Sequence, residues 1–483
     1  MTSGRTARVG VKTGGAGLRL LVAITLCLVI PASARAAADG ETPPKGTIVE
    51  SVAVREDPSQ SYALYLPAAY APERKWPLLI CFDPLARGKL PVERFRKAAE
   101  EYGLILVGSN NSRNGLDGAA LSKYVSSLWA DAHERFNIDD ARVYAAGFSG
   151  GARLATGFAA NCRGCIAGVF ASGAGFSSGS VPTQPLPFAL FGAVGFDDFN
   201  FGELRELQKA LDATGTPSVF ETFDGGHEWP PEDVCEKALA WFRLRAMRGG
   251  SLAKDDKFID AQLASRLADA ERRLASKEYV DVYEGYLAVV RDFQGLRDVS
   301  AAAADNAARL KTSAGLKSEF QTEAELVRRQ AQVTSEIRAL WTKRAEPDET
   351  PTPRQEARER LGDWRKKSAL AEDSSERRLA RRVLFELLIG AYESANAAVS
   401  RVKNYEAAAA NLELARAVEP KNANLAYELA RVYALGGQKS SALLALEDAV
   451  SLGFKDGGRL TSDAAFAALS RESRFQKIVS TLK

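Results

Sequence analysis

Short apolar runs alternate with longer amphipathic segments through the first half of the chain. Apolar runs of this length are typical of strands buried in a parallel sheet. We expect strands at residues 46–54, 62–66, 78–82, 104–108, 166–171, 188–191 and 219–223. We expect helices at residues 92–102, 119–136 and 232–248. This alternation predicts an α/β fold with a mainly parallel sheet and helices on both of its faces.

A different pattern begins after Gly249-Gly250. No proline occurs from Ser251 to Glu346, and the segment is rich in alanine, leucine and charged residues that favour helices. Large apolar side chains share one helical face at Tyr279, Tyr283, Tyr286, Leu287 and Val290. Residues 251–483 are therefore predicted to form an all-α helical domain.

The end of the chain contains an internal repeat. An Ala-x₃-Leu-x₂-Ala pattern starts at Ala408 and again at Ala442, 34 residues later. This spacing resembles tetratricopeptide repeats, in which helix pairs bury their apolar faces by stacking on neighbours. The resemblance is clearest at 389–456, and a degenerate version covers 266–293. It implies a surface for a protein partner, with a solvated spacer as the alternative.

The first 36 residues have the features of a secretory signal peptide. Five basic residues and no acids precede Ala37, an apolar stretch runs from Leu20 to Ile30, and Ala34-Arg35-Ala36 fits a cleavage site. Residues 37–47 are rich in turn formers and are interpreted as a linker. Because the apolar stretch is short for a bilayer, we expect a secreted or periplasmic protein with no stable membrane span. An uncleaved anchor is the alternative.

The stretch at 142–154 has the pattern of a strand, a sharp turn and a helix. Ser149 occupies the turn, between Gly147 and Gly151 in a Gly-x-Ser-x-Gly pattern. A serine nucleophile must project from a tight and crowded turn, where residues without Cβ are needed on both sides. The helix that follows would direct its first amides at the same place, so the N–H of Gly150 is a candidate oxyanion donor. A glycine-rich turn in a non-catalytic domain is the alternative.

A serine nucleophile needs a base, and the chain has two histidines. His133 lies in a helical pattern before Ser149 and is interpreted as an ordinary helix residue. His227 lies in a loop after an expected strand, from which it could reach a neighbouring site. Between the two, another expected strand leads into a loop with adjacent acids, Asp197 and Asp198. The order serine, acid, histidine is that of the α/β-hydrolase fold.

Three of these segments together resemble secreted α/β-hydrolases of the esterase, feruloyl-esterase and polyhydroxyalkanoate-depolymerase kind. The segments are 147–151, 195–200 and 225–230, and the hydrolase domain would span residues 48–248. The resemblance implies that Asp198, three positions after Gly195, orients the imidazole of the base. Asp197 would then face solvent or cap a helix that starts near Gly202.

The resemblance leaves the substrate contacts more open. Many members of this group carry a His-Gly stretch after the third strand, where this chain reads Phe82 to Gly88. The second oxyanion donor is therefore undecided, and Leu85 is the candidate in this loop. Trp229 is either a substrate wall or an ordinary packing residue.

Composition argues against several other classes of site. The formal net charge of +3 is too small to indicate nucleic-acid binding. Cys162 and Cys165 either form a small local disulfide or remain thiols, and Cys81 lies in an expected buried strand. Scattered cysteines and two histidines do not make a zinc site, so we expect no metal and no cofactor.

These residues predict a secreted serine hydrolase that cleaves a small-molecule or polymer-borne carboxylic ester. Ser149 would attack the carbonyl, His227 would carry the proton, and Asp198 would orient the imidazole. Two alternatives are a catalytically silent hydrolase domain in a protein-interaction scaffold and a serine peptidase. Because every candidate residue precedes Gly249, we expect the helical domain to be separable from the chemistry.

Overall fold

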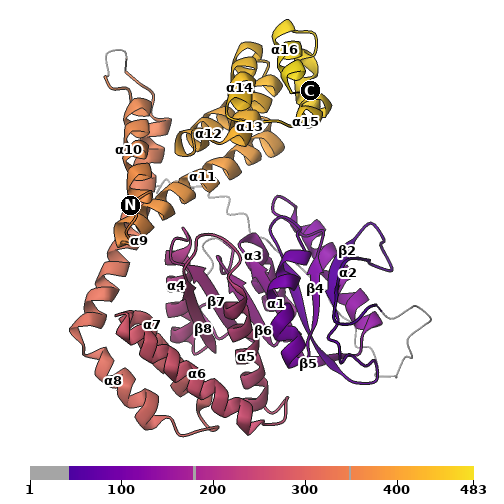
Figure 1. Cartoon of the computed structure of the whole chain (residues 1–483), viewed down its shortest axis with the longest axis vertical. Coiled ribbons are helices and arrows are strands. Elements are labelled where there is room, and N and C mark those ends of the chain that lie inside the picture. The colour runs from indigo at the N-terminus through magenta and orange to yellow at the C-terminus, as the bar shows by residue number, and fades with distance from the viewer. Residues whose placement is uncertain (1–42, 178–180, 347–349, 483) are drawn as a thin grey trace, which may run out of the picture. The chain divides into compact units, whose positions relative to one another are not determined.

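The computed structural model describes residues 43–177, 181–346 and 350–482 of the chain (Figure 1). The predicted signal peptide, its cleavage site and most of the predicted linker lie outside these residues. The described chain divides into two compact units. The first runs up to Val169 and includes Phe176–Ala189, and the second comprises Phe170–Gly175 and Leu190–Lys483.

The sheet has eight strands in the order β1-β2-β4-β3-β5-β6-β7-β8. The strands are β1 Ile48–Ala53, β2 Ser61–Tyr65, β3 Trp76–Phe82, β4 Ile105–Ser109, β5 Ile138–Phe148, β6 Gly168–Ser172, β7 Ala189–Gly195 and β8 Ser218–Phe223. β3 pairs in parallel with β4 and β5, and β7 pairs in parallel with β8. β2 runs antiparallel to both β1 and β4. The predicted α/β fold with a mainly parallel sheet is confirmed.

The first unit shows why its apolar runs form strands. Every residue of β3 is buried, and Leu78, Leu79 and Ile80 are inaccessible or nearly so. A strand buried on both faces needs an unbroken apolar run, which is the pattern the sequence has. The helices of this unit are α1 Lys89–Tyr102, α2 Gly118–Arg135 and α3 Gly150–Asn161. Asp117 begins α2 by accepting a hydrogen bond from the N–H of Ala120 at 2.8 Å.

The second unit contains β7, β8 and the helices that follow them. Next to the sheet these are α4 Phe201–Thr214 and α5 Glu232–Arg248. The other α-helices are α6 Asp256–Ala275, α7 Tyr279–Phe293, α8 Asp305–Lys311, α9 Ala314–Thr342, α10 Pro353–Ser368, α11 Ser375–Val402, α12 Tyr405–Val418, α13 Ala423–Leu435, α14 Lys439–Ser451, α15 Gly457–Ser462 and α16 Ser473–Thr481. A π-helix covers Ser300–Ala304 and a 3-10 helix covers Ala464–Leu469. The helix-rich C-terminal half is confirmed. The expected boundary at Gly249-Gly250 falls between α5 and α6, and the division into domains at that point stays a prediction.

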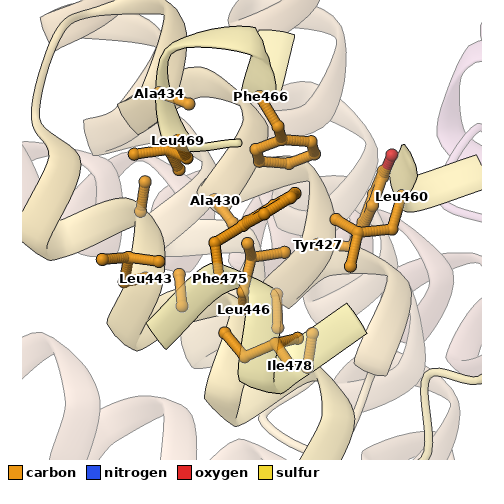
Figure 2. Packing of buried hydrophobic residues seen from close by; sticks show 14 of the residues in the cluster. Tyr427, Ala430, Ala434, Leu443, Leu446, Leu460, Phe466, Leu469, Phe475 and Ile478 are labelled. Carbon is orange, nitrogen blue, oxygen red and sulfur yellow. The ribbon is translucent and has the colours of Figure 1, made fainter. Parts of the chain in front are cut away.

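The repeated positions near the C-terminus are all buried in helices. Ala408, Leu412 and Ala415 lie on α12, and their counterparts 34 residues later lie on α14. Figure 2 shows the apolar cluster that α14 shares with α13 and the last helices, in which the ring of Phe466 lies 5.6 Å from that of Tyr427 and 6.0 Å from that of Phe475, centroid to centroid. Stacked helix pairs that share a core agree with the repeat pattern, and their tetratricopeptide-like nature stays a prediction.

Two further sequence questions have structural answers. Cys162 and Cys165 are joined by a disulfide with their Cα atoms 5.6 Å apart, so the first of the two alternatives holds. Within the residues described above, no helix is both long enough and apolar enough to cross a bilayer.

Candidate active site

Ser149 lies at the junction predicted for it, between the last residue of β5 and the first of α3. Its backbone has φ 53° and ψ −121°, a conformation that residues with a Cβ rarely adopt. Such a conformation costs about 1–3 kcal/mol and is kept only where the surrounding structure enforces it. The strand, sharp turn and helix expected around Ser149 are therefore present.

The flanking glycines are required by close backbone approaches. A Cβ on Gly147 would lie 2.1 Å from the carbonyl oxygen of Gly151, and a Cβ on Gly151 would lie 2.0 Å from that of Phe82. These contacts are with backbone atoms, which cannot swing away as a flexible side chain can. Gly150 is crowded by the side chain of Asn114, whose Oδ1 would lie 1.8 Å from an added Cβ.

We predict that Gly151→Ala lowers the stability of the protein, although alanine is the better helix former. Overpacking of this kind costs about 1–3 kcal/mol or more. Gly157→Ala is the matched control, because it lies on the same helix and an added Cβ meets nothing within 4 Å. The control should gain about 0.5–1 kcal/mol from helix propensity. Urea denaturation measures both changes, and equal effects of the two variants would show that the turn at Ser149 is not tightly packed.

The loop after β3 contains a buried carboxylate that organises its own backbone. Asp83 accepts hydrogen bonds from the N–H of Leu85 at 2.8 Å and from the Nε and Nη2 atoms of Arg87, both at 2.9 Å. The side chain of Leu85 is 64% exposed. Because the amide of Leu85 already has an acceptor, its role as second oxyanion donor stays a prediction. The N–H of Gly150, the first residue of α3, has no acceptor within its helix.

The structure brings together the expected acid and the expected base. Asp198 follows β7 and His227 follows β8, and the Nδ1 atom of His227 lies 2.9 Å and 3.0 Å from the two carboxylate oxygens of Asp198. Asp198 is fully buried. The two loops can approach because Gly195 has no side chain: a Cβ there would lie 2.4 Å from the carbonyl oxygen of Gly225.

Burial has the largest effect on the protonation of Asp198. It raises the pKa of Asp198 above the usual value of a carboxyl. The hydrogen bond and positive charge of His227 oppose that rise. Two other groups also act to lower this pKa. The N–H of Asn200 donates to Asp198 at 2.8 Å, and Arg382 contributes a positive charge.

Asp197 has a different environment from its neighbour, as expected for adjacent side chains in an extended loop. Its Oδ2 atom accepts a hydrogen bond from Nη1 of Arg381 at 2.7 Å. The expectation that Asp197 faces solvent or caps a helix is wrong, because its side chain is only 10% exposed and forms an ion pair with α11, and the N-cap of α4 is Asn200. The structure therefore gives Asp197 a structural partner and leaves Asp198 beside the imidazole.

Sequence reasoning missed the contribution of α11. Arg382 donates from Nε to the carbonyl oxygen of Phe196 at 2.7 Å. The ring of Phe385 lies 5.8 Å from the ring of His227, centroid to centroid, and 5.7 Å from that of Phe199. The arginines at 378, 381 and 382 follow helical spacing, which was the available signal, but nothing in the sequence says what such a face contacts.

The two remaining candidates have simpler surroundings. His133 lies on α2, where its ring stacks on Trp129 at 4.1 Å and its Nδ1 atom is 2.8 Å from the carbonyl oxygen of that residue. It is a helix residue, as interpreted from the sequence.

Trp229 is only 4% exposed, so little of its ring faces outward, and a contact with substrate stays a prediction. Among the described residues, no group of three or more histidine, cysteine or acidic side chains is placed to hold a metal.

No family model matches the chain, and the search of curated proteins finds no relative of it. Several solved structures are similar to part of it. An S-formylglutathione hydrolase from Staphylococcus aureus is 16% identical with a TM-score of 0.33, over 42% of this chain and 99% of that one. A ferulic acid esterase is 18% identical with a TM-score of 0.33, over 40% and 94%. An esterase from Pyrobaculum calidifontis is 13% identical with a TM-score of 0.35, over 42% and 87%.

Proposed function

We propose that this protein is a serine hydrolase that cleaves carboxylic esters through an acyl-enzyme on Ser149. The observation that carries the proposal is the hydrogen bond between Nδ1 of His227 and the buried carboxylate of Asp198. The strained turn that presents Ser149 supports it independently. The three residues follow β5, β7 and β8 in the order of the α/β-hydrolase fold.

The proposed mechanism uses each group for one task. With Nδ1 of His227 bonded to Asp198, the imidazole presents Nε2 to accept the proton of the Ser149 hydroxyl as Oγ attacks the ester carbonyl. The N–H of Gly150 stabilises the oxyanion that forms. Collapse of this intermediate expels the alcohol, which takes the proton from the imidazolium, and leaves Ser149 acylated. Water then attacks the acyl-enzyme by the same route and releases the acid.

A buried carboxylate bonded to a histidine is hard to explain in a silent domain. Burying an ionisable pair costs free energy that well-packed apolar side chains would not. A domain that serves only as a scaffold has no need of a histidine in a fixed tautomer, whereas a base needs both that tautomer and a stabilised imidazolium. A serine peptidase would use the same groups, so the ester preference rests on the resemblance of segments 147–151, 195–200 and 225–230.

The pH dependence of turnover should have one acid limb. The base must be neutral to accept a proton, so kcat/KM should fall as the pH drops into the acid range. Burial raises the pKa of Asp198, so protonation of this carboxyl begins at higher pH than usual and adds to the loss in the same direction. Rates on a soluble ester measured from pH 4.5 to 9 test this. A profile that stays flat between pH 5 and 8 argues against a histidine base.

A substrate screen tests the proposed reaction class. We would assay p-nitrophenyl esters of graded chain length beside feruloylated sugars, acetylated sugars and a peptide substrate. Turnover of an ester supports the proposal, and the chain-length preference defines the acyl group. Cleavage of the peptide with no ester turnover would favour the peptidase, and inertness of folded protein towards all of them would favour the scaffold.

A further inference from the structure

One face of α11 contacts the loop that carries the acid. The arginines on this face follow helical spacing, and they contact two adjacent residues of the loop, Phe196 and Asp197. The guanidinium of Arg378 lies 4.2 Å from the centroid of the Phe196 ring. Arg381 pairs with Asp197, and Arg382 donates to the carbonyl oxygen of Phe196, two residues before Asp198.

Arg382 is the most buried of these arginines, with 4% of its surface exposed. Its guanidinium carbon lies 3.9 Å from the centroid of the Phe201 ring, and its Nε donates to a carbonyl oxygen. Burial lowers its pKa to about 10, while the charges of Glu323, Asp197 and Asp198 act in the opposite direction. Arg382 therefore stays protonated at neutral pH and places a full positive charge in the interior beside the acid loop.

Other contacts hold the same loop from the helical half of the chain. Gln330 of α9 donates from Nε2 to the carbonyl oxygen of Phe199 at 2.8 Å. The rings of Phe199, His227 and Phe385 contact one another, with centroid distances between 4.6 Å and 5.8 Å. The backbone on both sides of Asp198 and the ring of the base are thus held by residues from α9 and α11.

We infer that Arg382 is a positioning residue of the active site, which fixes the backbone of the acid loop and supplies a positive charge beside Asp198. The inference rests on the proposed function, because it assigns a role in the acid–base chemistry. It also means that the helical half is required for full activity. We expected this half to be separable from the chemistry because every candidate residue precedes it in the sequence. That expectation did not take into account the contacts that α9 and α11 make with the acid loop.

The charges around the acid and base determine the sign of the expected effect. They come from Arg378 and Arg382 of α11, Glu323 of α9, and Asp197 and Asp224 of the loops. Arg381 of α11 adds a positive charge that is paired with Asp197. Removal of the positive charge of Arg382 disfavours the carboxylate and raises the pKa of Asp198 further. The same removal favours the protonated imidazole. Both changes move the acid limb of the rate profile to higher pH.

The first test compares Arg382→Met with Arg382→Lys in the full-length protein. Methionine keeps much of the length and loses the charge, so kcat/KM should fall about 10- to 100-fold. Its acid limb should move up by on the order of half a pH unit or more. Lysine keeps the charge but not the planar guanidinium, so its acid limb should return toward the wild-type position while part of the rate loss remains.

The second test does not depend on turnover. The chain has two histidines, so the ¹³C-labelled imidazole signals in an NMR titration are few, and His133→Gln identifies which belongs to His227. The titration midpoint of His227 should rise in Arg382→Met and return in Arg382→Lys. An unchanged midpoint in folded Arg382→Met would overturn the inference, whether or not the wild-type protein hydrolyses esters.

Arg266→Gln is the matched structural control. Arg266 is a partly buried arginine of the same unit, and its Nη1 atom lies 2.8 Å from the buried carboxylate of Asp292. Its loss should lower the melting temperature without moving either the His227 midpoint or the acid limb. If Arg266→Gln moves both as far as Arg382→Met does, the effect is one of general stability and the role given to Arg382 is wrong. Failure of the proposed function appears separately, as wild-type protein without serine-dependent ester turnover.

Discussion

Ser149→Ala should abolish ester hydrolysis, with a fall in kcat of about 10⁴-fold or more. The substitution removes one oxygen atom, the proposed nucleophile, and no other group in the proposed site can replace it. Alanine keeps the Cβ, so the backbone strain at φ 53° is the same as in the wild type. The fold should therefore survive, and the loss should appear in kcat rather than in the amount of folded protein.

Ser126→Ala is the matched control for this experiment. Ser126 lies on α2 in the same unit as Ser149, and its hydroxyl donates to the carbonyl oxygen of Lys123 at 3.0 Å. It should keep wild-type turnover. Near wild-type turnover by purified Ser149→Ala, with its melting temperature unchanged, would show that the chemistry lies elsewhere.

Asp198→Asn should lower kcat by on the order of 10⁴-fold. Asparagine has nearly the same size, but it carries no charge to stabilise the imidazolium that forms when the base takes a proton. Its amide can also hold the imidazole in the wrong tautomer. Because Asp198 is fully buried, its side chain is shielded from bulk solvent, which could otherwise compensate for the lost charge.

The neighbouring acid provides the comparison. Asp197→Asn removes an ion pair with Arg381, a side chain that is 42% exposed. The Asp197 side chain is itself 10% exposed, but asparagine can still accept a hydrogen bond from Arg381, so turnover should change only a few-fold. Rates for the two variants on one soluble ester decide between the acids. A large loss in Asp197→Asn with little change in Asp198→Asn would reassign the triad acid and leave Ser149 and His227 in place.

The local parts of this site could be predicted from the sequence. The apolar run before Ser149 and the glycines around it describe a strand and a crowded turn, and both are properties of adjacent residues. The choice of His227 followed from the presence of only two histidines. The loop with Asp198 could be placed because it follows an apolar run, and strand ends are where side chains of an α/β sheet gather.

The contacts of α11 could not be predicted in the same way. Arg382 and Phe196 are 186 positions apart, and no sequence pattern in either segment indicates that the two are in contact. A run such as Arg377-Arg378 followed by Arg381-Arg382 is typical of a solvated helix face, and only tertiary packing makes Arg382 a buried residue. The hydrogen bond from the Leu85 amide to Asp83 was missed for a related reason, because it depends on how a short loop closes on itself.

Covalent labelling measures the central claim most directly. A fluorophosphonate probe reacts with a serine only when a base activates it and an oxyanion site stabilises the adduct. Treatment of the folded protein followed by peptide mass spectrometry should place the adduct on Ser149, and Ser149→Ala should not be labelled. Folded wild-type protein that remains unlabelled at Ser149 would contradict the proposal that this chain is a serine hydrolase.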